Sequence, residues 1–96
     1  MDLFDKDILA FDPFGPVRDE RIRIFSDLFV VTRAPHRCDV CREPIPARSR
    51  VRARTEKCPG EGFFGTLYFC AECCEAMGHA TRGNREEFDR RWAWPS

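Results

Sequence analysis

Two Cys-x-x-Cys pairs constrain this chain more than any other feature of its 96 residues. Cys38 and Cys41 form the first pair, Cys70 and Cys73 form the second, and 28 residues separate the pairs. One such pair alone is also compatible with a redox site, whereas two pairs are typical of a structural metal site. When each pair turns two thiolates toward one ion, the four thiolates complete a tetrahedron. The pattern therefore predicts one structural Zn²⁺, in a closed shell that leaves no position for water or substrate.

Two further cysteines and two histidines stand near this pattern. Cys74 directly follows the second pair, so on a helix it points about 100° away, and we interpret it as a small buried apolar residue. Cys58 falls in a predicted loop, where it is an ordinary loop residue, an alternative ligand or a reactive thiol beside Lys57. His36 and His79 could each replace a cysteine, but we interpret both as surface residues or as neighbours of the ligands. A redox role for the pairs lacks the βαβ pattern of a thioredoxin-like fold.

The beginning of the chain does not have the pattern of a secretory signal. It reads Met-Asp-Leu-Phe-Asp, without a basic region and without a long apolar run after it. We therefore expect no signal peptide and no transmembrane helix. The expected location is cytoplasmic, in a reducing environment where thiols bind metals more often than they pair. The alternative is an extracellular chain whose six cysteines form three disulfides.

The length suits one domain, which we place at residues 1–96. A chain of this size buries roughly 60–65% of its unfolded surface, so its core is modest and a metal would add much of the stability. The expected parts are an acidic N-terminal segment that could be mobile, a zinc core and a C-terminal helix, at residues 1–20, 31–80 and 84–94.

Local patterns predict the secondary structure. Alternating and β-branched stretches predict strands, amphipathic spacing predicts helices, and Gly and Pro mark the turns. The predicted strands are residues 21–25, 28–32, 49–55 and 63–69, and the predicted helices are residues 3–11, 70–80 and 84–94. Whether the first two strands are separate or continuous stays open. Asn84 with Glu87 resembles a capping box, and Phe88 and Trp92 share one face of the last helix.

The order of these elements around the cysteines is that of a treble clef. A knuckle carries the first pair, a β-hairpin follows, and a helix holds the second pair in its first turn. The unsatisfied N–H groups at a helix N-terminus stabilise the thiolates of Cys70 and Cys73. We therefore predict a small α+β treble-clef zinc-finger domain, with an extra N-terminal strand segment and a C-terminal helix.

Residues 31–77 resemble a known group of proteins. Thr-Arg-Ala-Pro-His-Arg-Cys-Asp-Val-Cys-Arg-Glu-Pro-Ile-Pro-Ala-Arg-Ser-Arg, followed by a hairpin and Tyr-Phe-Cys-Ala-Glu-Cys, is similar to small treble-clef zinc proteins that are common among phage and prophage proteins of unassigned role. The resemblance implies zinc ligation by the four paired cysteines, and a phage-encoded chain acting in the host cytosol. Arg48 stands where a turn glycine is usual in the group, and Cys70 where histidine is frequent. The group has no common chemistry to transfer.

Arginines alternate along the first strand of the predicted hairpin, at Arg48, Arg50, Arg52 and Arg54. Side chains two apart on a strand share a face, so we expect all four to project from one side while the residues between them face the core. We refer to this as the arginine face. Further residues could extend it as a binding surface for a partner or for nucleic acid: Arg37, Arg42, Lys57, Arg33, Phe63 and Phe64.

The formal net charge is +0, which conceals a positive middle between acidic neighbours. Like charges on one face repel one another unless something neutralises them. Nucleic-acid phosphate, an acidic partner protein and the chain's own acidic segment are three candidates, and a solvated face is the fourth. The acidic segment contains Asp2, Asp5, Asp7, Asp12, Asp19 and Glu20. Overall neutrality weakens the case for nucleic acid.

The sequence therefore favours a non-catalytic, zinc-stabilised binding protein over an enzyme. Neither a catalytic triad nor a phosphate-binding loop is present, and the cysteines fill the predicted metal site. The expected partner is a host or phage protein, and phage origin adds the hypothesis of an inhibitor of a host defence complex such as CRISPR interference. A nucleic-acid-binding zinc finger that uses the arginine face is the alternative. We expect neither a membrane nor a small-molecule substrate.

Overall fold

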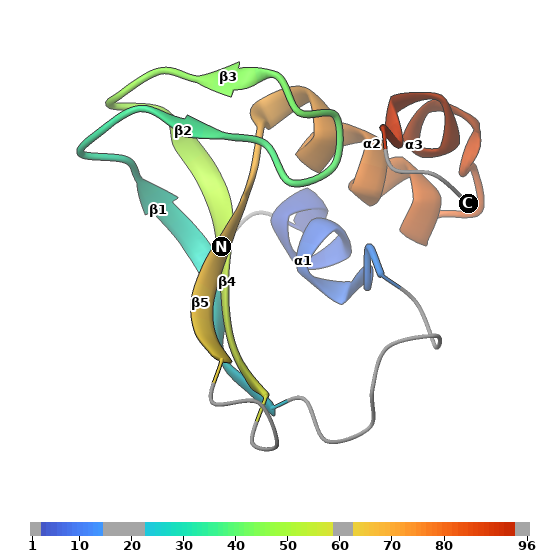
Figure 1. Ribbon diagram of the computed structural model, residues 1–96. Coiled ribbons are helices and arrows are strands. Elements are labelled where there is room, and N and C mark those ends of the chain that lie inside the picture. The colour runs from blue at the N-terminus through green and yellow to red at the C-terminus, as the bar shows by residue number, and fades with distance from the viewer. Residues whose placement is uncertain (1–2, 15–22, 59–62, 94–96) are drawn as a thin grey trace.

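The computed structural model describes residues 3–14, 23–58 and 63–93, apart from the side chains of residues 58, 63 and 64. A three-stranded sheet carries helices on one side, and a two-stranded sheet lies at one of its ends (Figure 1). The elements in chain order are α1 (Leu3–Ala10), β1 (Arg23–Val31), β2 (His36–Arg37), β3 (Pro44–Ile45), β4 (Arg50–Cys58), β5 (Phe63–Phe69), α2 (Ala71–Thr81) and α3 (Glu86–Arg91). The predicted α+β class is confirmed. Within these ranges, every helix is too short or too polar to cross a membrane.

The larger sheet is antiparallel, in the order β1-β4-β5, so β4 is its central strand. The two stretches predicted around residues 21–32 form the single strand β1, with a bulge between Ile24 and Ser26. A bulge absorbs one residue without ending a strand, so the alternating stretch continues into the β-branched one. The predicted hairpin of β4 and β5 is confirmed. Residues 59–62, which belong to the predicted loop, lie outside the described residues.

The two faces of this sheet differ because the helices cover only one of them (Figure 1). On the covered face, Phe29 of β1 lies opposite Arg52 of β4. Arg52 in turn contacts the Ile8 carbonyl near the end of α1 and the sulfur of Met77 in α2. Alternation places the intervening residues of each strand on the other face, which we call the open face.

α1 packs across α2 and closes the helical side of the molecule. Ile8 is buried in the core, and the ring of Phe4 lies so close to Gly78 that a Cβ on that residue would clash with it. Arg82 Nε donates to the Asp7 carboxylate at 2.6 Å and holds the two helices together at the surface. The helix predicted here is confirmed, and the described part of the acidic segment is packed against the core.

α3 is shorter than the helix predicted for the end of the chain. Its N-cap residue is Arg85, whose own side chain makes no capping hydrogen bond. Asn84 Oδ1 instead accepts the N–H of Glu86 at 3.2 Å, so the predicted capping box is wrong. The predicted apolar pair is confirmed: Phe88 is buried, and its ring centroid lies 5.9 Å from that of Trp92.

Candidate metal centre

Cys38, Cys41, Cys70 and Cys73 lie together, and we refer to them as the cysteine cluster. Their Sγ atoms all lie within 4.8 Å of one another, and those of Cys41 and Cys70 are 3.7 Å apart. All but Cys41 are buried. In a tetrahedron with metal–sulfur distances of about 2.3 Å, the sulfurs lie about 3.8 Å apart. The cluster therefore has the dimensions of a tetrahedral site and could hold one metal ion.

The first pair of cysteines lies in a tight turn between β2 and β3. Cys38 N–H donates to the Glu43 carbonyl at 2.9 Å, and Arg42 N–H donates to the Cys38 carbonyl at 3.1 Å. Arg42 has φ 69°, a left-handed conformation that is uncommon for a residue with a side chain. The Arg37 guanidinium donates to the Arg42 carbonyl at 2.6 Å and so supports this turn. Val40 N–H points at the Cys38 sulfur, 3.4 Å away, where it stabilises negative charge.

The second pair lies at the N-terminus of α2. Cys70 is the N-cap residue of this helix, and its sulfur accepts the N–H of Cys73 at 3.4 Å. The N–H of Cys70 itself donates to the sulfur of Cys38 at 3.4 Å, which joins the start of the helix to the turn. Backbone N–H groups and the positive end of the helix thus face the sulfurs, as the sequence predicts.

Four thiols in so small a volume cannot all ionise unless a cation balances their charge. Hydrogen bonds from the Cys70 and Cys73 thiols hold the pKa of Cys38 far below its ordinary value. The hydrogen bond to Cys38 raises the pKa of Cys70 to about 12, and Cys38 and Cys70 together raise the pKa of Cys73 as well. These shifts favour a thiolate at Cys38 that accepts hydrogen bonds from the Cys70 and Cys73 thiols. A divalent cation would allow all four to ionise.

Contacts around the cluster fix its position and oppose its negative charge. Asp39 N–H donates to the Tyr68 carbonyl at 2.9 Å, and the Asp39 carboxylate accepts the N–H of Tyr68 at 2.9 Å, so the turn is bound to β5. Arg91 of α3 lies beside Cys73. Burial alone would lower the pKa of Arg91. The charge of Cys73 and a hydrogen bond to it have the opposite effect, and the pKa of Arg91 is raised above its ordinary value. The guanidinium is therefore placed to compensate negative sulfur.

Cys74 points away from the cluster, as predicted. It is buried, its Sγ donates to the Phe69 carbonyl at 3.3 Å, and burial raises its pKa to about 11. Cys58 lies at the end of β4 rather than in the predicted loop, and its side chain lies outside the described residues. The five cysteines whose side chains are described are free thiols, which disagrees with the alternative of three disulfides.

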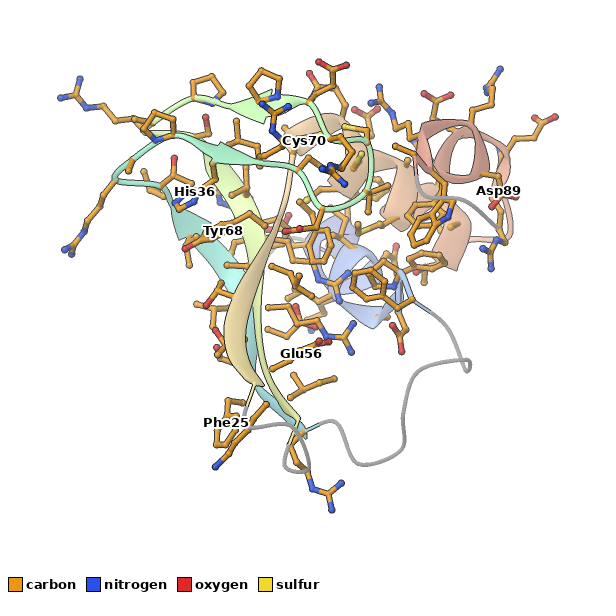
Figure 2. All side chains as sticks on the ribbon, viewed as in Figure 1. Phe25, His36, Glu56, Tyr68, Cys70 and Asp89 are labelled. Carbon is orange, nitrogen blue, oxygen red and sulfur yellow. The ribbon has the colours of Figure 1, made fainter. Side chains whose placement is uncertain are left out.

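Neither histidine belongs to the cluster of possible metal ligands among the described residues. His36 stacks on Tyr68, with 3.8 Å between the ring centroids and 14° between the ring planes (Figure 2). His79 is exposed on α2, where its ring lies 5.3 Å from that of Phe4. Their interpretation as surface residues or neighbours of the ligands fits these positions.

The prediction of an exposed arginine face is wrong, because β4 turns its arginines toward the helices. Arg52 and Arg54 are only 1% and 5% exposed, so neither can contact an external phosphate or partner. Arg48 precedes β4 and has φ 64°, so it does not share the alternation of the strand. Arg50 stays exposed, but its guanidinium donates to the Asp5 carboxylate at 2.9 Å.

The buried arginines are neutralised from within the chain. Arg52 donates through Nε and Nη2 to the two carboxylate oxygens of Asp27, both at 2.7 Å. Its Nη1 donates to the Ile8 carbonyl at 2.9 Å and the Phe11 carbonyl at 2.8 Å, which satisfies groups at the C-terminal end of α1. Arg54 contacts the carboxylates of Asp12 and Glu56. Glu56 points toward the helical side of the sheet (Figure 2). We refer to the whole set as the arginine network: Asp12, Asp27, Arg52, Arg54 and Glu56.

Of the neutralising partners considered, the chain's own acidic segment therefore contributes, through Asp5 and Asp12. Asp27 of β1 adds a carboxylate that the charge pattern does not single out. The other predicted binding residues do not gather on one strand face. Those that are exposed are Arg33, Arg37, Arg42 and Lys57. Phe63 and Phe64 lie in β5, and their side chains lie outside the described residues.

The apolar side chains of β1 are exposed, which the patterns noted in the sequence do not predict. Ile24, Phe25, Leu28 and Val31 are 50%, 61%, 46% and 64% exposed. A signal for them exists in the sequence, since this stretch carries apolar residues at successive positions rather than only at alternate ones. Such a strand needs cover on both faces, and here the helices cover only the middle of one face.

The fold and the cysteine cluster together define a small α+β domain with four cysteines placed so that they could hold a metal ion. Comparison with family models, with curated protein sequences and with solved structures found no match.

Proposed function

We propose that this chain is a non-catalytic domain, stabilised by one Zn²⁺ bound to Cys38, Cys41, Cys70 and Cys73, that acts by binding another protein. The observation that carries the metal part is the approach of four sulfurs to within 4.8 Å of one another, in a frame of N–H donors. This proposal adopts the zinc-knuckle and treble-clef interpretation of the fold.

Zinc is the metal that this set of ligands favours. Four thiolates in a tetrahedron suit Zn²⁺ or iron, and both occur in proteins with paired Cys-x-x-Cys turns. Zn²⁺ has no redox chemistry and accepts the tetrahedral geometry that four thiolates provide, so it suits a closed structural site. Because four protein ligands complete its coordination, the ion has no position for water or substrate and serves the fold.

The proposed partner is a protein because of the surfaces that the chain presents. Arg52 and Arg54, which would have been central to a phosphate-binding face, are buried and bonded within the chain. Exposed apolar side chains lie instead along β1. Apolar surface of this kind on a small domain marks protein interaction sites. In the narrower form that the phage resemblance implies, the partner is a host or phage protein, such as a component of a defence complex.

Native mass spectrometry of the purified chain tests the metal and the partner class together. We expect one zinc per chain, and no adduct with a short mixed-sequence DNA duplex at moderate salt. A pull-down from lysate of the natural host should then recover a protein in stoichiometric amount. A chain without metal, a salt-sensitive DNA adduct, or Mg²⁺-dependent nuclease activity in the pure protein would each contradict the proposal.

A further inference from the structure

The exposed apolar side chains of the molecule are concentrated on one strand. Among the described residues, five large apolar side chains are strongly exposed, and all except Leu3 lie on β1. Phe25 lies at the end of the sheet, far from the helices (Figure 2). Exposing four such groups on one strand adds no stability to a monomeric domain, but it provides contact area for a strand that binds a partner.

β1 is also an edge strand. In the order β1-β4-β5 it has a strand neighbour on one side only, within the part of the chain that the structure describes. It is nine residues long. A long, exposed and apolar edge is a template for pairing, and proteins use such edges to bind an extended segment of a partner as an added strand. An added strand would lie beside the exposed groups on both faces of β1.

The open face next to this edge contains a groove of about 360 Å³. It is lined mainly by small, β-branched and aromatic groups, among them Ser26, Leu28, Val30, Thr55, Thr66 and Tyr68, and Arg33 also lines it. The hydroxyls of Thr55 and Thr66 bond to each other at 3.0 Å, so they need no external partner. β1 contributes Ser26, Leu28 and Val30 to this lining, so a strand added beside β1 would meet uncharged side chains on this face.

The charges at the two ends of the edge are basic. Lys57 of β4 lies opposite the first residue of β1 in the register, and its side chain is exposed. Arg33 is exposed two residues after the other end of β1. The one carboxylate within the strand, Asp27, is held by Arg52 on the covered face. A segment with acidic residues at its ends would therefore be complementary to this edge.

We propose that the edge of β1 binds an extended segment of a partner protein, apolar at alternate positions and acidic at its ends, as an added strand. This inference rests on the proposed function, since it names the surface and the partner chemistry of that binding domain. The four side chains supply the contact area, and the basic ends of the edge select the charge of the partner.

Peptide binding to the zinc-loaded full chain tests the inference. The probes are synthetic peptides of about ten residues, which match the length of β1, with Val, Ile or Thr at alternate positions and Glu at both ends. A second set carries Lys in place of Glu. We expect the acidic set to bind at least about tenfold more tightly, as measured by fluorescence anisotropy, and to slow hydrogen exchange of the β1 amides.

Variants locate the site. Leu28→Ser with Val31→Ser should weaken binding by about tenfold or more, since both side chains lose contact area. Leu3→Ser is the matched control, because Leu3 is 73% exposed but lies on α1, and it should leave binding unchanged. Lys57→Glu with Arg33→Glu should also weaken binding of the acidic set. Arg90→Glu on α3, which is remote from the sheet, controls for charge.

Each other outcome overturns the inference. Failure of both sets to bind below about 1 mM, equal binding of the two sets, or insensitivity to the β1 variants would show that the edge is not this docking site. Dimerisation through β1 in sedimentation experiments would assign the edge to a second copy, and binding of an oligothymidylate there would assign it to nucleic acid. If the Leu28 and Val31 variant still holds zinc and still recovers the partner from lysate, the surface is wrong but the proposed function stands.

Discussion

The cysteine cluster and the arginine network are both buried polar centres, but they solve the problem of buried charge differently. The arginine network pairs its charges inside the chain, where two guanidinium groups contact three carboxylates. The cysteine cluster has no such partner within it and needs a cation to ionise fully. The cysteine cluster therefore depends on a metal from solution, whereas the arginine network depends on groups of the chain itself. The two should therefore respond differently to chelation, salt and substitution.

The largest expected effect is loss of the metal. Cys73→Ser removes a ligand and should abolish stoichiometric zinc binding and cooperative unfolding, because structural zinc supplies an apparent ~10–16 kcal/mol in small domains. That is comparable to the whole stability of a domain of this size, about 5–15 kcal/mol. Zinc content by mass spectrometry and thermal unfolding by circular dichroism measure both effects. Excess chelator should do the same to the unmodified chain.

Cys74→Ser is the matched control for this substitution. The side chain is the next in the sequence and is equally buried, but it lies outside the cluster and bonds to the Phe69 carbonyl. A serine hydroxyl can replace that bond, so we expect full zinc content and a loss of about 1 kcal/mol. Equal behaviour of the two variants would show that the cluster does not hold the metal.

The second effect tests the arginine network. Arg52→Met should destabilise the fold by about 3–5 kcal/mol, because it leaves the Asp27 carboxylate and two carbonyls at the end of α1 without their donor. Zinc stoichiometry should not change, since Arg52 makes none of the contacts of the cluster. Urea denaturation of the zinc-loaded protein measures the loss. Adding Asp27→Leu should recover part of the lost free energy of unfolding, because two apolar residues leave no unpaired charge. If the double variant loses as much as the two single variants together, Arg52 and Asp27 are not coupled.

These two centres also show what the sequence can and cannot reveal. The cysteine cluster follows from short spacings, because only two residues separate the members of each pair and the local turn or helix start fixes their direction. The hairpin, α2 and the first helix follow from local patterns in the same way. The arginine network depends on contacts between distant residues: Arg52 bonds to Asp27, 25 positions away, and Arg54 bonds to Asp12, 42 positions away. Alternation gives the common face of Arg52 and Arg54 but not the element that covers it.

Helix α1 is the element that covers these arginines. Its sequence predicts a helix but not the surface against which it packs, so an arginine face that looks solvent-directed becomes buried once α1 lies on β4. The same packing explains the exposed groups of β1. α1 and α2 cover the middle of the sheet, and the ends of β1, at Ile24 and Val31, extend beyond them. A strand pattern alone carries no information about where the cover ends.

A third prediction concerns the charge around the metal. Arg91→Gln should lower the affinity for zinc by about 10- to 100-fold without unfolding the loaded protein, because the guanidinium bonds to Cys73 and opposes the negative charge of four thiolates. Competition with a chelator of known affinity measures the change. Arg90→Gln is the control, because Arg90 pairs with Glu87 as Arg91 does, but its side chain is 71% exposed. Equal loss in both variants would point to a general effect of helix charge.

The smallest expected effect comes from the one arginine of the strand that stays at the surface. Arg50 bonds to Asp5 at 2.9 Å, as closely as Arg52 bonds to its partners, but its side chain is 58% exposed. An exposed ion pair contributes about 0–1 kcal/mol and weakens with salt, whereas a buried one is screened much less. Arg50→Gln should therefore cost less than about 1 kcal/mol in urea denaturation at low salt, and less still at high salt. A loss as large as that of Arg52→Met, or one insensitive to salt, would mean that burial is not what separates the arginines of β4, and that α1 depends on its surface pair as much as on the network beneath it.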